Sequence, residues 1–302
     1  MQNLKKVAAL AVIPKETAAS KGTASNGVRE VNMPLITITE SIGCGAMGIA
    51  RRVADNLNVS FYGDSNLRDQ AIRMGLDRSK LHEFQEKIPT WFDRLMGDKP
   101  EVYAKLISSV IYEAAHNGEG VIIGHGSQVL LQDFNCAMHV LVTASRERRI
   151  SNLMEQRGLS REGAEIVIHK SDKQKEKFFR FAFQRDWDDP SLYDLSVNPG
   201  KIGIERAAQT IVATARYPEL RACNIHALDA IERLSKTKRI EAALLEHDLL
   251  RVSVDMPQKG VVHIAGVLYN QAEKEHTLNI IRGIPGVERV DTDVVVMPAG
   301  SV

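Results

Sequence analysis

The stretch ITITESIGCGAMGIARRVAD, Ile36 to Asp55, decides the fold, because it reads as a strand, a glycine-rich turn and a helix in that order. Proteins use this succession to hold phosphate groups, since glycines allow close backbone approach and a helix N-terminus attracts anions. Gly43 and Gly48 have the spacing of the GxxxxGK[ST] motif, but Ile49 and Ala50 stand where the lysine and the hydroxyl residue are expected. The stretch therefore predicts a phosphate-binding loop that lacks its usual cation.

The overall charge and hydrophobicity of the chain limit the kinds of molecule that it is expected to bind. The chain has 302 residues, with 39 Lys and Arg against 38 Asp and Glu. This balance excludes the strong basic excess that marks nucleic-acid binders, so we expect no nucleic-acid partner. No apolar run reaches the roughly 18 residues that a transmembrane helix needs, so we expect no transmembrane segment. The length is sufficient for two domains, each with its own core.

The N-terminus and the cysteines bear on location. Residues 1–32 are mostly small, polar and aperiodic, and we expect a disordered extension there, with a secretion signal as the less favoured alternative. Cys44, Cys136 and Cys223 are far apart and form no CxxC pair, so their spacing suggests neither a disulfide framework nor a zinc site. Such cysteine usage is typical of a reducing cytoplasm, which is the location that we expect.

Strand and helix patterns alternate between about residues 33 and 218. Short apolar segments follow the strand pattern at residues 36–39, 120–124, 137–144 and 192–198. Helical patterns fill most of the intervals, with a charged helix-forming stretch to about residue 97 and others at 100–116, 145–158, 160–185 and 204–216. This alternation predicts a three-layer α/β domain with a parallel sheet. Ligands of such sheets bind at the carboxyl ends of the strands, where Gly43, His125 and Thr143 are expected.

The pattern changes after about residue 222. Residues 224–298 read as helix, strand, strand, helix and strand, which predicts a small α+β domain of its own. The chain is thus expected to consist of the extension at 1–32, a large domain at 33–218 and a small domain at 224–298.

Two resemblances support this division. Residues from about 35 to 215 resemble the cytidylate kinase-like family, a branch of the P-loop nucleoside monophosphate kinases, through ITITESIGCGAMGIARRVADNLNVSFYGD, GVIIGHGSQVLL, HVLVTASRERRISNLMEQRGLSREGAEIVIHKSDK and DWDDPSLYDLSVN. The last of these is the most specific. Residues from about 225 to 298 look like a BON domain through VVHIAGVLYN and IPGVERVDTDVVV. The resemblances imply a P-loop kinase-like sheet followed by a BON-like α-β-β-α-β domain.

The first resemblance implies an enzyme that transfers a phosphoryl group from ATP, with Mg²⁺, to a nucleoside monophosphate such as CMP. In the resembling kinases an arginine commonly stands where Met47 stands here, and another stands at His125. The cations of the segment after residue 145 are therefore expected to compensate. The implied phosphate-binding residues are Gly43, Cys44, Gly45, Ala46, Met47 and Gly48; the catalytic residues are Arg146, Arg149 and Lys175; the acceptor-binding residues are Asp64, His125 and Asp186.

Other interpretations remain open at this point. The lost cations also fit a catalytically weak or inactive module that senses a nucleotide and signals through the BON-like domain. That domain could instead bind a protein or lipid partner. The histidines show no metal-ligand spacing, so no metal site is expected within the protein.

Overall fold

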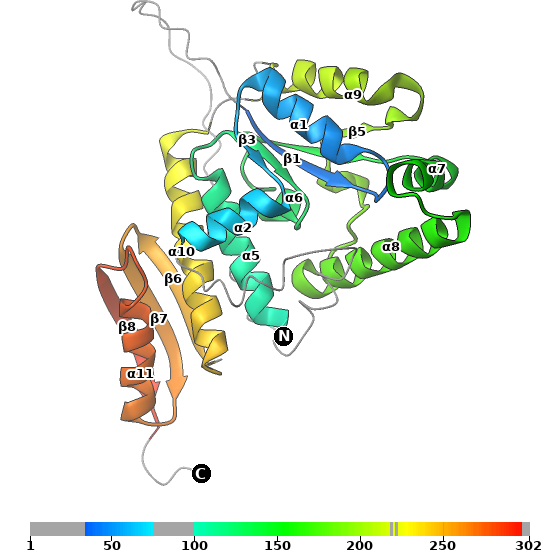
Figure 1. The fold of residues 1–302 in the computed structure, drawn as a ribbon. Helices are drawn as coiled ribbons and strands as arrows, with labels where there is room; N and C mark the ends of the chain where they lie inside the picture. The colour runs from blue at the N-terminus through cyan, green and yellow to red at the C-terminus, as the bar shows by residue number, and fades with distance from the viewer. Residues whose placement is uncertain (1–33, 75–99, 218–219, 221–222, 250, 298–302) are drawn as a thin grey trace, which may run out of the picture. The chain divides into compact units, whose positions relative to one another are not determined.

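The computed structural model describes residues 34–74, 100–217, 220, 223–249 and 251–297 (Figure 1). In these residues five parallel strands form one sheet in the order β2-β3-β1-β4-β5, and three strands form a second sheet in the order β6-β7-β8. The strands are β1 Leu35–Glu40, β2 Phe61–Tyr62, β3 Gly120–Ile123, β4 Ala137–Val142, β5 Leu195–Val197, β6 Val252–Gln258, β7 Val261–Leu268 and β8 Arg289–Val296. The helices are α1 Ala46–Leu57, α2 Asp64–Arg73, α5 Pro100–Ala115, α6 Ser127–Leu130, α7 Arg146–Arg157, α8 Arg161–Phe183, η3 Pro190–Leu192, α9 Pro199–Ala215, α10 Ile225–Glu246 and α11 Gln271–Arg282.

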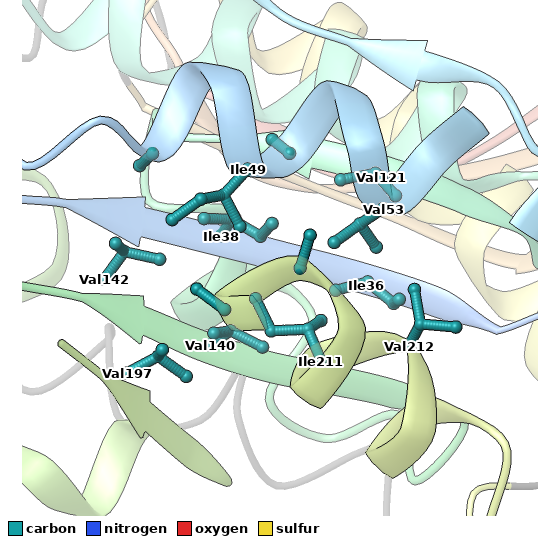
Figure 2. Close-up of a cluster of buried hydrophobic side chains, with 14 of the residues drawn as sticks. Ile36, Ile38, Ile49, Val53, Val121, Val140, Val142, Val197, Ile211 and Val212 are labelled. Carbon is teal, nitrogen blue, oxygen red and sulfur yellow. The ribbon is translucent and has the colours of Figure 1, made fainter. Parts of the chain in front are cut away.

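The central strand β1 has helices on both faces because its apolar side chains alternate between them. Ile36 and Ile38 are fully buried in a core with residues of α1 and α9, and Figure 2 shows Ile49, Val53 and Ile211 in this core. Leu35 instead joins the core of α2, α5, α6 and the first half of α10. The three-layer parallel architecture expected from the sequence is therefore confirmed.

Some element boundaries differ from those expected. Helix α9 begins at Pro199 rather than at residue 204, because Asn198 caps it by accepting a hydrogen bond from Gly200 N at 2.9 Å. The apolar pattern did not reveal this start, since Gly203 breaks the helical geometry with a φ of 78°. The expected disordered extension, and the expected helical stretch from residue 75 to residue 97, lie outside the described residues.

The cysteine expectation is wrong for two residues. Cys136 lies just before β4, Cys223 lies just before α10, and the two form a disulfide. Sequence spacing gave no sign of it because 87 residues separate the pair. Folding brings the start of β4 and the start of α10 into the same core, which places the two sulfur atoms together.

The small sheet has the expected element order, α10-β6-β7-α11-β8. Strands β6 and β7 are antiparallel, whereas β7 and β8 are parallel with α11 between them in sequence. Buried side chains of both helices and all three strands form the core of this unit, among them Ile240, Val262, Ile264, Ile281 and Val294. Among the described residues, no helix combines the length and apolar character that crossing a membrane requires.

Helix α10 belongs to two cores. Ala227 and Ile231 are buried against the large sheet's helices, whereas Ile240 and Leu244 are buried in the small unit. Polar contacts add to the packing on α5, since Ser235 Oγ donates to Ser109 O at 3.0 Å. The boundary near residue 224 stays a prediction, and the packing indicates that the large domain depends on the helix that follows it.

We therefore expect Ile231→Ala to lower the free energy of unfolding by about 2–5 kcal/mol, the cost of emptying a fully buried isoleucine site. The matched control is Ile225→Ala on the same helix, because Ile225 is 73% exposed and should change stability by less than about 0.5 kcal/mol. Urea unfolding followed by circular dichroism measures both values. Equal losses for the two variants would contradict the assignment of α10 to the large core.

Candidate functional site

The glycine loop joins β1 to α1 at the carboxyl end of the sheet. Gly43 and Gly45 both have a φ of 85°, a left-handed conformation that favours glycine. A Cβ atom at Gly43 would lie 2.8 Å from the carbonyl oxygen of Arg149, so this glycine is also needed for the approach of α7. No side chain caps α1 at Gly45. The N–H groups of a helix's first turn lack partners within the helix, so this end of α1 suits an anion.

The sequence comparison with GxxxxGK[ST] used the wrong register. Helix α1 already begins at Ala46, so Gly48 lies inside the helix rather than in the loop. Ile49 and Ala50 are fully buried in the core beneath α1. A lysine at position 49 would therefore point into the sheet and not toward a phosphate. The apolar residues at these two positions follow from helix packing.

Side chains of α7 and α8 donate hydrogen bonds to carbonyl oxygens of the loop and of Glu40, the residue at which β1 ends and the loop begins. We call this position the root of the loop. Arg149 Nε donates to Ile42 O at 2.7 Å, and Asn152 Nδ2 donates to Gly43 O at 2.8 Å. Lys175 Nζ donates to the carbonyl oxygen of Glu40, the last residue of β1. The helices that carry the predicted catalytic cations thus lie directly on the glycine loop.

The three predicted catalytic cations have different environments. Arg149 is buried and forms a bidentate ion pair with Asp172, at 2.9 and 2.7 Å, so its charge is already neutralised. The Arg146 side chain is 59% exposed, and its nearest carboxylate is that of Glu165 at 3.7 Å. Arg149 and Lys175 both place their cationic groups against the loop, and of the two only Arg149 forms a bidentate ion pair with a carboxylate. The catalytic roles themselves stay predictions.

Lys175 lies in a buried polar group that includes Glu40 and Cys44. Burial lowers the pKa of Lys175, and the attraction of Glu40 opposes this shift. Burial likewise raises the pKa of Glu40, against the attraction of Lys175. The Lys175 ammonium also lies 4.7 Å from the centre of the Trp187 ring, a distance typical of a cation–π contact. The ammonium is therefore held beside the loop by a carboxyl group and an aromatic ring.

The loop side chains themselves offer little chemistry. Cys44 and Ala46 are buried, and Met47 is 38% exposed, so these predicted phosphate-binding positions can contribute mainly their backbone amides. Burial, followed by the repulsion of Glu40, raises the pKa of the Cys44 thiol to about 12. The thiol is therefore a packing group rather than a nucleophile at neutral pH.

Two of the three residues predicted to bind the phosphoryl acceptor are in contact with each other. His125 Nε2 and Asp64 Oδ1 are 2.9 Å apart, across the ends of β3 and β2. Although burial opposes it, the hydrogen bond with His125 lowers the pKa of Asp64. Asp186 lies elsewhere, paired with Arg180 at 3.0 Å on an exposed surface. The structure thus joins His125 and Asp64 but not Asp186.

Sequence reasoning missed several residues around the loop. Glu40 carried no functional signal in the sequence, because it continues the pattern of a strand. Asp172 carried none either, because this residue lies among many other charged residues of one helix. Asn152 carried a usable signal, since it follows Arg149 by three residues and so shares a face of α7. Trp187 lies in DWDDPSLYDLSVN, the most specific stretch of the resemblance. Among the described residues, no group of three or more His, Cys, Asp or Glu side chains is placed to hold a metal ion.

Comparison with known proteins finds a matching family, a relative by sequence and relatives by structure. The family model described as the cytidylate kinase-like family matches residues 35–201, more than half of the chain. A cytidylate kinase of Pyrobaculum calidifontis is 23% identical over 173 residues, which are 57% of this chain and 87% of that protein. A solved structure of an uncharacterised protein from Eubacterium ventriosum has a TM-score of 0.48 at 18% identity and covers 61% of this chain and 98% of its own. Shikimate kinase from Bacteroides thetaiotaomicron has a TM-score of 0.39 at 15% identity, with coverage of 61% and 99%.

The approach of α7 to the loop predicts a steric cost at Gly43. Gly43→Ala should lower the free energy of unfolding by about 1–2 kcal/mol for the left-handed backbone, and by about 1–3 kcal/mol more for the clash with the Arg149 carbonyl. Gly158→Ala is the matched control, because Gly158 has a φ of 64° but open space around its Cβ position. It should show only the backbone cost in the same urea titration. A Gly43→Ala protein as stable as Gly158→Ala would show that α7 does not constrain the loop.

The cysteine environments predict a thiol count. Native protein purified without reductant should show no thiol that reacts rapidly with Ellman's reagent at pH 8, because roughly one Cys44 side chain in 10⁴ is then a thiolate. Unfolding without reductant should expose one thiol, and unfolding after reduction should expose three, given one disulfide and one free cysteine. Three reactive thiols in unreduced, unfolded protein would rule out the disulfide.

Proposed function

Because this chain belongs to the cytidylate kinase-like family, we propose that it transfers the terminal phosphoryl group of ATP to a nucleoside monophosphate such as CMP. The observation that carries the proposal is the position of the Lys175 ammonium at the root of the glycine loop. Phosphoryl transfer depends on cations that neutralise phosphate charge, and the loop has none of its own. A lysine from α8 supplies the charge from outside the loop.

The donor nucleotide fits the loop through backbone groups. The uncapped N-terminus of α1 offers N–H donors for a phosphate, and the positive φ angles of Gly43 and Gly45 shape the turn that precedes it. Lys175 then balances the phosphate charge in exchange for its contact with the Glu40 carbonyl.

Magnesium enters the proposal as part of the nucleotide. The hydroxyl residue that holds the ion in the usual motif is absent, because residues 43–48 include no serine or threonine. The described residues therefore do not fit a protein-held Mg²⁺ site at this position. Mg²⁺ commonly binds through substrate phosphates with few protein ligands, so MgATP as a substrate is compatible with the site.

The acceptor is proposed to bind between β3 and α2. The His125 and Asp64 pair lies at the carboxyl ends of neighbouring strands, where ligands of parallel sheets bind. The His125 ring would contact the acceptor phosphate, and Asp64 orients that ring through its hydrogen bond at 2.9 Å. Asp186 and Arg146, which lie on exposed surfaces, would need a rearrangement of α7 and α8 to take part.

For the small unit we propose a BON-like role as an attachment module. Its order of α10, β6, β7, α11 and β8 agrees with the pattern that VVHIAGVLYN and IPGVERVDTDVVV suggest. Its partner would be a protein or a lipid. A cytoplasmic location also remains part of the proposal.

The role of Lys175 can be tested by three variants. Lys175→Met should lower kcat/KM for ADP formation from ATP and CMP by about 10–10²-fold, the value of one charge-assisted phosphate contact. Lys175→Arg keeps the charge and should retain more activity. Lys173→Met is the matched control on the same helix, because Lys173 is exposed, and it should stay within about twofold.

A coupled assay of ADP release with a panel of nucleoside monophosphates measures these rates, and calorimetry measures ATP binding separately. An active Lys175→Met enzyme would assign the missing cation to another residue. ATP binding without transfer to any acceptor would refute the enzyme and leave a nucleotide-sensing module.

A further inference from the structure

A partly buried chain of hydrogen bonds connects α6 to the DWDDPSLY segment. Gln128 Nε2 donates to the hydroxyl oxygen of Tyr193 at 3.0 Å, and the Tyr193 hydroxyl donates to the backbone carbonyl of Trp187. Gln128 is fully buried. The chain therefore links the segment just after His125 to the residue whose ring contacts Lys175.

The direction of this chain is fixed by its last member. A backbone carbonyl can only accept hydrogen bonds, so the Tyr193 hydroxyl must donate to Trp187. The Tyr193 oxygen then accepts, which requires the amide nitrogen of Gln128 to face it. Burial raises the pKa of Tyr193 to about 12, so the hydroxyl keeps its proton at neutral pH. The amide oxygen of Gln128 must consequently point away from Tyr193.

That amide oxygen has no hydrogen-bond partner among the residues that the structure describes, and neither does the Oγ atom of the neighbouring Ser127. Both atoms are buried. Most buried polar atoms in folded proteins have partners, and an unpaired one needs an explanation. A ligand that supplies a donor is one such explanation, and the place of α6 favours it.

Helix α6 follows directly on Gly126, next to His125 at the carboxyl end of β3. The ring of Phe183, the last residue of α8, covers this turn, since a Cβ atom at Gly126 would lie 2.2 Å from it. The Gln128 side chain is fully buried in this structure, so a ligand could reach its amide oxygen only if the end of α8 moved.

We propose that Gln128 is a specificity-determining residue whose amide oxygen accepts a hydrogen bond from the exocyclic amine of the acceptor base. This inference rests on the acceptor site proposed above and adds the chemistry that it selects. Tyr193 and the Trp187 carbonyl are positioning groups, because they prevent the amide from rotating to present its nitrogen.

The fixed orientation of the Gln128 amide determines which acceptor bases it favours. Cytosine carries an exocyclic amine, a donor, where uracil carries a carbonyl oxygen, an acceptor. An amide oxygen attracts the first and repels the second. A site with a buried group of fixed polarity rejects the analogue that leaves that group unpaired. Bases that carry the amine should therefore bind more tightly than those that carry the carbonyl.

The experiment measures equilibrium binding of CMP and UMP by calorimetry, so that it does not depend on phosphoryl transfer. The wild-type protein should bind CMP at least about 10-fold more tightly than UMP, the ratio that one well-placed hydrogen bond supports. Tyr193→Phe frees the amide to rotate and should reduce this ratio to within about twofold. The matched control is Tyr217→Phe, because Tyr217 is 61% exposed, and it should keep the wild-type ratio.

A second variant tests the same inference at Gln128 itself, in protein whose folding is checked separately. Gln128→Met keeps the length of the side chain without its polar atoms and should also abolish the ratio, in protein shown by thermal unfolding to be folded. Equal wild-type affinities, a ratio unchanged in Tyr193→Phe, or no binding of either nucleotide would each overturn the inference. Selective CMP binding without phosphoryl transfer would support it while refuting the enzyme.

Discussion

The glycine loop depends on donors that bind its carbonyl oxygens. The carbonyl groups of Glu40, Ile42 and Gly43 lie at the end of β1, where the strand's own hydrogen bonds stop. Lys175, Arg149 and Asn152 supply the donors, and all three come from α7 and α8. Because an unpaired buried carbonyl is costly, the loop and these helices are mutually dependent. The position of α7 in turn requires a glycine at position 43.

This dependence changes the meaning of the missing lysine. In the usual motif the cation belongs to the loop and stays with it. Here the cationic groups at the loop come from α7 and α8, and the Lys175 ammonium of α8 contacts the ring of Trp187, which follows that helix. Charge at the phosphate position is therefore coupled to the docking of a helix, and movement of that helix would alter both the cation and the cover over α6. One helix thus contacts both the glycine loop and the turn that precedes α6.

The two sheets are connected by a helix rather than by a loose linker. The first half of α10 completes the core of the large sheet, and its second half completes the core of the small one. The disulfide between Cys136 and Cys223 fastens the start of α10 to the start of β4. Helix α5 packs on α10 and is joined to it by the hydrogen bond between Ser235 and Ser109.

The sequence by itself determined the layers, because apolar periodicity records which faces are buried. Alternation at Ile36 and Ile38, and the helical spacing in α1, α7 and α8, were sufficient for the three-layer fold and for the small α+β unit. It also indicated Gly43, Gly45, His125 and Asp64 as parts of one site. Only the tertiary structure decided that Ile49 faces the core, that Arg149 is neutralised by Asp172, and that Lys175 reaches the loop. It alone paired Cys136 with Cys223 and fixed the Gln128 amide. These contacts join residues from distant parts of the chain, and local patterns of polarity carry no information about which distant partner a buried polar group will meet.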